Sequence, residues 1–480
     1  MRGGDHQNWK DLYDDVRKAL GSPADLVLRR VTLRGGQTVQ CFYLESMVDK
    51  QTIGDYVLRK IDDEHGVAEA DAFVREVPFS VPHDDMVNQA VTAVIHGQCV
   101  VVDHLRERVC LVDVFGPANR SVEEPKAEAI IRGPHEGFTE NILTNVGLIR
   151  KKIRNPNLRF EKMTIGKQTH TTVLLAYMEN LAPEVLVQEA RRRLMAIRTD
   201  SILDSAYVEE FIQDKILTPF PTLGNTERPD MVSAQLLDGK VAILVDGTPS
   251  ALVAPVTFFE FFTSPEDYYQ RADIATFIRW IRMISFVLAV FVPSMYVAAT
   301  TFHQELIPTQ LLISLSAQRE GVPLPSLVEV LVMEVLFEII REAGLRMPRA
   351  VGQALSIVGA IVLGQAAVEA GLISAAIVIV VSITGIANFV VPTYSFGITQ
   401  RLLRFTFVFL AGFMGLFGIL CGLLFMIAHL VSLKTFGVPY LTPVVPTRLP
   451  EWKDVLIRVP RPAMKIGRLP SYIEYLKKRK

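Results

Sequence analysis

The residues best suited to do chemistry in this chain are glutamates inside an apolar stretch. Residues 327–340 are apolar except for their glutamates, and Glu334, Glu338 and Glu342 are spaced so that a helix places them in one stripe. Because a carboxylate at membrane depth is costly, this acidic membrane stripe should face protein or water. An interfacial helix explains the spacing equally well, and its stripe would then meet Arg341, Arg346 and Arg349.

The usual signatures of covalent catalysis are missing from the sequence. It contains no GxxxxGKS or GxxxxGKT loop, no HExxH, no GxSxG and no CxxC pair. His83, Asp84 and Asp85 are adjacent, but they begin a predicted helix, where solvated or capping roles are commoner than metal binding. The cysteines lack metal-type spacing and read as reduced structural thiols: Cys41, Cys99, Cys110 and Cys421. We therefore expect no enzyme, no cofactor and no metal site.

The second half of the chain has the composition of an α-helical transmembrane domain. Residues 283–304 and 350–368 contain no Asp, Glu, Lys or Arg, and two longer uncharged runs cover 370–400 and 405–433. Each run is long enough to cross the hydrocarbon as a helix. Within them, Asn388 and Pro392 can end or kink a span, and the Gly418–Gly422 pair indicates a close helix contact.

Basic residues predict the orientation of these segments. Arginine clusters precede the first, second and last spans, and the tail from Lys434 holds eleven Lys or Arg against three acids. All of them should lie on the cytoplasmic side, which requires an even number of crossings. Since five hydrophobic segments are apparent, one part must be re-entrant, lie on the surface or double back.

The first half alternates strand and helix signals, which predicts an α/β architecture. Strands are expected over 26–33, 38–44, 98–102, 109–114, 158–165, 171–178 and 240–245, and helices over 141–154 and 206–216. The net charge is −1, so the chain has no overall positive field that would recruit nucleic acid. The N-terminus is polar and shows no cleavable signal, which predicts that the N-terminal half is cytoplasmic. We expect a multi-domain chain divided as follows: polar segment 1–24, α/β subdomains 25–130 and 131–250, junction 251–282, membrane domain 283–433 with four to six hydrophobic segments, and basic cytoplasmic tail 434–480.

Three long motifs together resemble the spore germination GerA family. They begin at Arg120, Val245 and Arg341 and read RSVEEP…IRGPHEGFTE…TNVGLIR, VDGTP…APVTFFE…SPEDYY and REAGLRMP…GQ…SIVG. The resemblance extends from about Asp25 to Leu441. The family includes A subunits of germinant receptors and a paralogue, stage V sporulation protein AF. The amino-acid sequence around Asp246 and Ser264 is more similar to that of the receptor A subunit than to that of the paralogue.

The resemblance implies a nutrient-responsive receptor complex in the inner membrane of a bacterial spore. Its expected partners are a transporter-like B subunit, a lipoprotein C subunit and membrane lipid. In this family the A subunit is thought to form a homo-oligomer that acts as a nutrient-gated ion channel, and we expect this chain to form one that passes cations. A non-conducting scaffold that organises receptor clusters is the alternative, and a secondary transporter is a third possibility that lacks the expected inverted repeat.

Residues 350–370 are the candidate pore helix. One helical face carries the proposed pore-lining residues Val351, Leu355, Val358, Val362, Gln365 and Glu369. Valine rings could gate by dewetting, and a ring of Glu369 would favour cations. The alternative is a helix packed inside a monomeric bundle.

A polar motif in the soluble half is the last candidate site. Arg132, Glu136 and Glu140 could join this half to neighbouring subunits or to the membrane domain. We favour the structural alternative, in which the motif builds turns and helix caps between the two α/β units.

Overall fold

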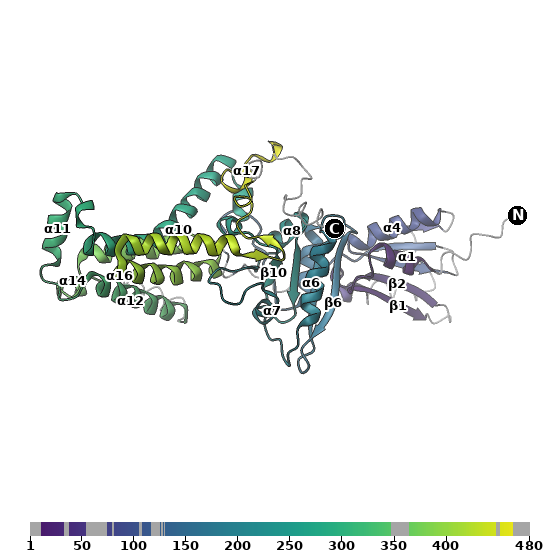
Figure 1. Ribbon diagram of the computed structural model, residues 1–480. Helices are drawn as coiled ribbons and strands as arrows, with labels where there is room; N and C mark the ends of the chain where they lie inside the picture. Colours follow the sequence, from purple (N-terminus) through teal and green to yellow (C-terminus); the bar gives the residue numbers. More distant parts are fainter. Residues whose placement is uncertain are drawn as a thin grey trace.

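The computed structural model describes residues 11–32, 38–53, 74–78, 81–104, 108–116, 125, 128, 130–346, 364–447 and 452–463. Figure 1 shows two α/β units followed by a helical part that extends away from them, with α11 and α14 at its far end. The α/β half followed by a helical half agrees with the expected order of the chain.

The first unit contains a five-stranded antiparallel sheet of order β1-β2-β4-β5-β3. Its strands are β1 Leu26–Thr32, β2 Thr38–Leu44, β3 Val74–Pro78, β4 Gln98–Asp103 and β5 Arg108–Asp113. Helices α1 (Leu12–Ala19) and α4 (His83–Ile95) pack on one face, whereas the short α2 (Lys50–Thr52) precedes Ile53, which packs on the other. Residues assigned above to a polar segment thus form α1, whose Leu12 and Val16 are buried because its apolar side chains share one face.

The second unit repeats this layered plan with a sheet of order β6-β7-β9-β10-β8. Its strands are β6 Leu158–Ile165, β7 Thr171–Met178, β8 Gly224–Thr226, β9 Val241–Val245 and β10 Ala251–Ala254. One face is covered by α5 (Ile142–Lys152) and α8 (Pro229–Leu237), the other by α6 (Glu184–Ala196) and α7 (Ser205–Ile212). Strand β9 is apolar throughout because it is buried on both faces.

Most strands of this half were predicted from the sequence, and β2, β6 and β7 have the predicted bounds. Helix α7, in contrast, was expected to reach residue 216 and ends at Ile212. The backbone becomes extended at Gln213, and Asp214 then accepts hydrogen bonds from Arg193 and from the backbone N–H of Phe436, which draw the chain away from the helix.

A buried ion pair joins the two α/β units. Arg150 of α5 donates from Nε and Nη2 to both carboxylate oxygens of Asp25, at 2.9 and 2.8 Å, and Ser46 also donates to Asp25. Both charged side chains are under 5% exposed. The bidentate geometry fixes the orientation of one unit against the other.

The helical half is built around two long apolar helices. Its elements are η3 Phe258–Phe262, α9 Glu266–Tyr269, α10 Ala272–Thr301, η4 Gln304–Leu306, α11 Thr309–Arg319, α12 Ser326–Arg346, α14 Gly364–Glu369, α15 Ala375–Phe389 and α16 Tyr394–Ser432. By length and composition α10 and α16 could each cross a membrane, and α15 is a shorter apolar helix. As expected, the uncharged run around Asn388 is interrupted: α15 ends at Phe389 and α16 begins after Pro392.

Helix α16 is a hairpin that folds back at Gly415. The backbone there has φ 58° and ψ −141°, which is not helical, and a side chain at Gly418 would overlap the carbonyl of Leu410. At the other end, Phe396 and His429 both belong to the aromatic cluster around Phe258. A straight helix would separate these two residues by about 50 Å. The sequence left three arrangements that would place all basic clusters on one side: a re-entrant segment, a surface-lying segment or a segment that doubles back. The hairpin is the third of these.

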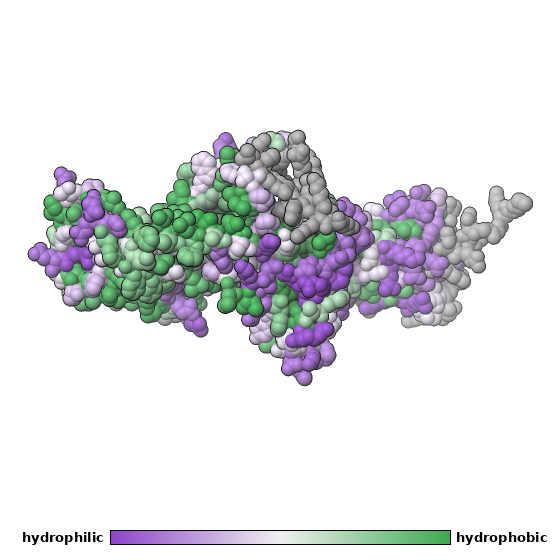
Figure 2. Space-filling view, viewed as in Figure 1, coloured by the Kyte–Doolittle hydropathy of each residue, from purple (hydrophilic) through white to green (hydrophobic). Residues whose placement is uncertain are grey.

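The outer surface of this half is apolar. Figure 2 shows hydrophobic residues over most of the helical part and hydrophilic residues over the α/β units. Large exposed side chains include Phe277, Ile284, Ile386, Phe413 and Phe425, each more than half exposed. A water-facing surface seldom carries so large an apolar area, and lipid or another subunit would cover it.

Candidate functional site

The acidic stripe meets arginines of the neighbouring helix. Arg404 of α16 lies 2.9 Å from Glu334 and 3.2 Å from Glu338, both on α12. Arg401 of α16 and Arg341 of α12 also bind Glu338, at 3.2 and 2.7 Å. We call these five residues the charge network. The glutamates are four residues apart on α12 and the arginines of α16 are three apart, so each pair lies on one face of its helix. These two faces meet at the interface between α12 and α16.

Because the charge network is buried, its charged side chains need one another as partners. The side chains of Glu334 and Arg404 are 1% and 2% exposed, and Glu338 is 23% exposed. An isolated buried charge costs several kcal/mol, so each member needs its partners to remain charged at this depth. The network holds two carboxylates and three guanidinium groups and thus carries a surplus of one positive charge.

Glu342 is separate from the network. It pairs with Arg346 one turn further along α12, at 2.7 Å, with side chains 58% and 80% exposed. The stripe therefore combines both expected arrangements: Glu334 and Glu338 face protein, whereas Glu342 meets an arginine at the surface. Arg349 lies outside the described residues.

A further glutamate in the same apolar stretch binds at the start of α15. Glu329 is fully buried and accepts a 3.1 Å hydrogen bond from the backbone N–H of Ser374, the N-cap residue of α15. Arg319 lies 3.4 Å from its other oxygen. A carboxylate is favoured there because the N-terminus of a helix carries partial positive charge.

The junction between the halves is a second charged cluster. Asp267 is 2% exposed and binds Arg279 at 3.3 Å and Arg282 at 2.8 Å, both near the start of α10. The neighbouring tyrosines reach outward, as Tyr268 donates to Asp454 and Tyr269 donates to Asp230 of α8. The motif therefore ties the second α/β unit and the C-terminal segment to the base of α10.

Residues 213–223 form a strap from the second α/β unit to the helical half. Thr399, on the outward arm of the hairpin, donates to the carbonyl of Pro219, and Thr218 shares a 2.8 Å hydrogen bond with His429 on the return arm. Phe220 is 2% exposed within the aromatic cluster of Phe258. The strap thus holds both arms of the hairpin.

The chain following the hairpin also binds the strap. Two short strands, β11 (Lys434–Thr435) and β12 (Val438–Pro439), pair with each other; Thr435 donates to Thr222, and Tyr440 donates to Pro221, each at 2.7 Å. Later come α17 (Trp452–Val455) and η7 (Arg461–Ala463).

The proposed pore helix lies largely outside the described residues, including Val351, Leu355, Val358 and Val362. Gln365 and Glu369 are described and exposed on α14, where Gln365 donates a 2.8 Å hydrogen bond to Glu369. Helix α14 lies at the end of the bundle furthest from the α/β units (Figure 1).

Glu136 and Glu140 of the polar motif make their hydrogen bonds within the second α/β unit. Glu136 accepts from Lys151 and Lys152 of α5, and these bonds hold its pKa below the ordinary value although burial acts to raise it. The carbonyl of Glu140 accepts from the backbone of Gly247. Arg132 and the side chain of Glu140 are exposed.

Sequence reasoning named Arg341 and Arg346 beside the acidic stripe, but it missed the partners that lie on other elements in both clusters. Arg401 and Arg404 were interpreted only as signals of orientation, and Asp267 only as part of a motif. The available signal was the pairing of arginines three apart on one apolar helix with glutamates four apart on another. Within the described residues, no group of three or more His, Cys, Asp and Glu could hold a metal ion.

Comparison with known proteins gives consistent results over nearly the whole chain. The family model described as Bacillus/Clostridium GerA spore germination protein matches residues 14–469. Spore germination protein KA of Bacillus subtilis (strain 168) is 42% identical over 453 residues, which cover 93% of this chain and 83% of that protein. Spore germination protein GerLA of Bacillus cereus is 40% identical over 478 residues, covering 97% and 96%. A crystal structure of the N-terminal domain of the A subunit of the Bacillus megaterium spore germinant receptor GerK3 is 32% identical, covers 51% of this chain and 92% of that chain, and has a TM-score of 0.36.

Proposed function

Because this chain belongs to the GerA family of spore germination proteins, we propose that it is the A subunit of a germinant receptor that responds to nutrients and triggers germination. The observation that carries this proposal is the family match, which spans both the α/β units and the helical half. The full-length alignment with GerLA supports it, since 96% of that protein is covered. We assign the chain no catalytic role.

We infer that the helical half lies in the spore inner membrane, with the α/β units on the spore-core side. The lengths and apolar composition of α10 and α16 support this placement. Arg279, Arg282, Arg401 and Arg404 all lie toward the end of the bundle nearest the α/β units, as the orientation rule for basic residues requires. The hairpin supports it further, because it returns the chain at Lys434 to that same end.

The receptor complex that we propose includes a transporter-like B subunit, a lipoprotein C subunit and several copies of this chain. The apolar outer surface supports an oligomer or a lipid-embedded bundle (Figure 2). Within the oligomer, Arg132, Glu136 and Glu140 remain proposed contacts, and the exposure of Arg132 and Glu140 leaves them accessible to another subunit.

Our proposal for the mechanism is a cation channel that nutrients open. Its pore would be lined by the face from Val351 to Glu369, and α14 would form the outer mouth. The exposure of Glu369 supports this arrangement, because a solvated ring of carboxylates at a pore mouth concentrates cations. The scaffold alternative is favoured by the strap and by the cluster around Asp267 at the junction, which tie the bundle to the second α/β unit.

Ion flux separates these two functions. The full chain with its B and C subunits is reconstituted in liposomes, and monovalent cation flux is measured with and without nutrient. Nutrient-dependent flux that Glu369→Gln reduces and Val362→Ala alters supports the channel. The matched control is Glu320→Gln, which removes an exposed acid at the same far end of the bundle. An intact assembly that passes no cations with any nutrient would move conduction to another subunit and leave this chain a scaffold.

A further inference from the structure

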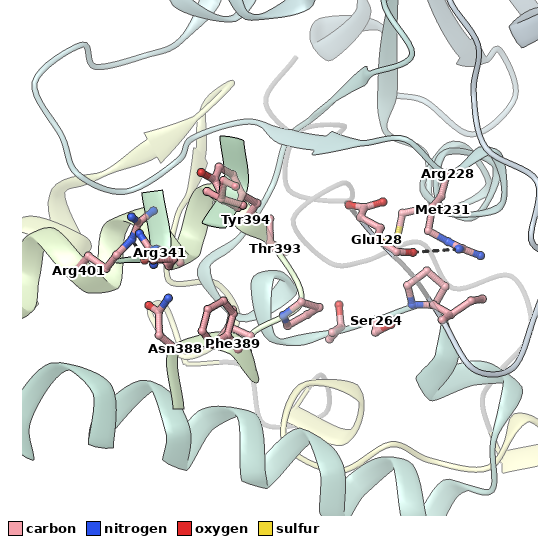
Figure 3. Close-up of a pocket in the computed structure, with 17 residues that line it drawn as sticks. Glu128, Arg228, Met231, Ser264, Arg341, Asn388, Phe389, Thr393, Tyr394 and Arg401 are labelled. Atoms are coloured by element: carbon pink, nitrogen blue, oxygen red, sulfur yellow. Dashed lines mark hydrogen bonds between the residues drawn. The ribbon is translucent and has the colours of Figure 1, made fainter. Parts of the chain in front are cut away.

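A cavity of about 380 Å³ lies where the second α/β unit meets the near ends of the bundle helices. Figure 3 shows Arg341 and Arg401 close together on one side, with Asn388 beside them. Across the cavity are Glu128 and Arg228. The walls thus come from the α/β half and from α12, α15 and α16.

The charges around this cavity favour an anion. Arg228 is neutralised by Asp230 at 2.9 Å. Arg341 and Arg401 share one carboxylate, Glu338, so this side of the cavity retains a surplus of positive charge.

The carboxyl group across the cavity opposes an anion only weakly. Glu128 is the acidic residue among those lining the cavity, and burial raises its pKa to about 7. A large fraction of this group is therefore uncharged at neutral pH.

Donors and one acceptor remain for a ligand. A guanidinium group has five N–H groups; Arg341 donates one to Glu338, whereas Arg401 donates to Glu338 and to the carbonyl of Gly397. Two arginines on adjacent helices match the oxygens of a phosphate. Asn388 is 8% exposed, and its Oδ1 has no hydrogen-bond partner, so it can accept from a ligand hydroxyl.

The rim of the cavity is apolar and continuous with the outer surface of the bundle. Leu345, Phe389 and Tyr394 line the cavity and are each 60% or more exposed. Phe389 continues a row of exposed apolar side chains on α15 that includes Ile379, Ile383 and Ile386. These residues are three or four positions apart and form one stripe along the helix, along which an acyl chain can lie.

We propose that this cavity binds the headgroup of an anionic glycerophospholipid, with its phosphate on Arg341 and Arg401 and a headgroup hydroxyl donating to Asn388 Oδ1. This inference rests on the proposed membrane placement, because the lipid must reach the cavity from the inner leaflet. Phosphatidylglycerol has the required phosphate and hydroxyls. Phosphatidylcholine has the phosphate but lacks the hydroxyls and carries a compensating cation.

The test is a titration of the purified full chain in neutral detergent with short-chain lipids. Phosphatidylglycerol should bind about tenfold more tightly than phosphatidylcholine, because phosphatidylcholine lacks the hydroxyl hydrogen bond and its cation is repelled by the arginine side of the cavity. Glycerol 3-phosphate and inorganic phosphate, titrated separately, distinguish a lipid from a free phosphate. Arg341→Gln should weaken phosphatidylglycerol binding about tenfold. The control Arg346→Gln removes the same charge from the same helix outside the cavity and should leave binding unchanged.

A second variant isolates the hydroxyl contact and remains informative if Arg341→Gln fails to fold. Asn388→Ala should weaken phosphatidylglycerol but not phosphatidic acid, which has no headgroup hydroxyl. Equal losses with Arg341→Gln and Arg346→Gln, or inorganic phosphate binding as tightly as phosphatidylglycerol, would overturn the lipid site. Binding and flux are independent results: selective lipid binding without flux overturns only the channel, whereas nutrient-dependent flux without lipid preference overturns only this inference.

Discussion

Replacing the arginine and replacing the glutamate of the buried pair in the charge network should lower the free energy of unfolding by different amounts. Arg404→Leu removes the cation that lies 2.9 Å from Glu334 and 3.2 Å from Glu338. Glu334 is then buried without a partner, and we expect a loss of about 3–5 kcal/mol in the free energy of unfolding. Glu334→Leu should cost less, about 1–3 kcal/mol, because Arg404 retains Glu338.

The double variant tests the reasoning most directly. In Glu334→Leu/Arg404→Leu an apolar pair replaces a buried ion pair, and Glu338 keeps Arg341 and Arg401. Replacing a buried pair with apolar side chains is often close to neutral, so the double variant should be more stable than the sum of the single losses by about 2 kcal/mol or more.

The measurement is unfolding of the full chain in mixed micelles, followed by loss of helical circular dichroism as the denaturing detergent increases. The matched control is the same cycle at Glu342 and Arg346, an ion pair on α12 with side chains 58% and 80% exposed. Its coupling should be about 0–1 kcal/mol. If the buried and exposed cycles gave the same coupling, the network would not be the desolvated pair that the geometry indicates.

Three further predictions concern the turn, the unit interface and the second α/β unit. Gly415→Ala should lower the melting temperature of the full chain and cost at least about 1–2 kcal/mol, because φ is 58° and a new Cβ would lie 2.8 Å from the ring of His303. Asp25→Asn should cost about 3–5 kcal/mol and increase limited proteolysis between the α/β units, because Arg150 loses a buried bidentate partner. Burial raises the pKa of Glu209 from 4.5 to about 7, so the folded state holds this proton more tightly and stability should fall as pH rises between these values. Glu209→Gln should remove that part of the pH dependence of thermal unfolding.

Each of these variants has a control of the same chemistry. Gly321→Ala places a Cβ in open space and should change the melting temperature little. Asp273→Asn breaks an exposed pair, with a cost of about 0–1 kcal/mol. Glu210→Gln alters an exposed neighbour and should preserve the pH dependence. A control as damaging as its partner would contradict the corresponding explanation.

Local patterns predicted the α/β half well because its strands are short, alternate in polarity or are wholly apolar, and end at clear turn residues. Helix α5 illustrates this, with its N-cap Asn141 accepting hydrogen bonds from Leu143 and Thr144. Strand β3 was missed because its five residues, VREVP, hold two adjacent charged residues and end in a proline, so they do not alternate as a strand does. Its place in the sheet comes from pairing with β5 and not from its own pattern.

The helical half shows where one-dimensional patterns fail. The run from 405 to 433 was predicted as a single uncharged run with room for a span, although its glycines indicated a close contact. Only tertiary packing shows that Gly418 and Gly422 face the preceding arm of the same helix and not a separate one. The partners of Glu334 and Glu338 on α16 were equally inaccessible, because Arg401 and Arg404 lie more than sixty residues further along the chain.

The strap has a mechanical consequence for the hairpin. Thr399 on one arm and His429 on the other are bound within a few residues of each other, at Pro219 and Thr218. Movement of the second α/β unit would therefore displace both arms in the same direction, and the hairpin would tilt as one lever around the base of α10 without its arms separating. Force applied to the second α/β unit would therefore reach the far turn at Gly415 as a sideways shift, amplified by the length of the arms.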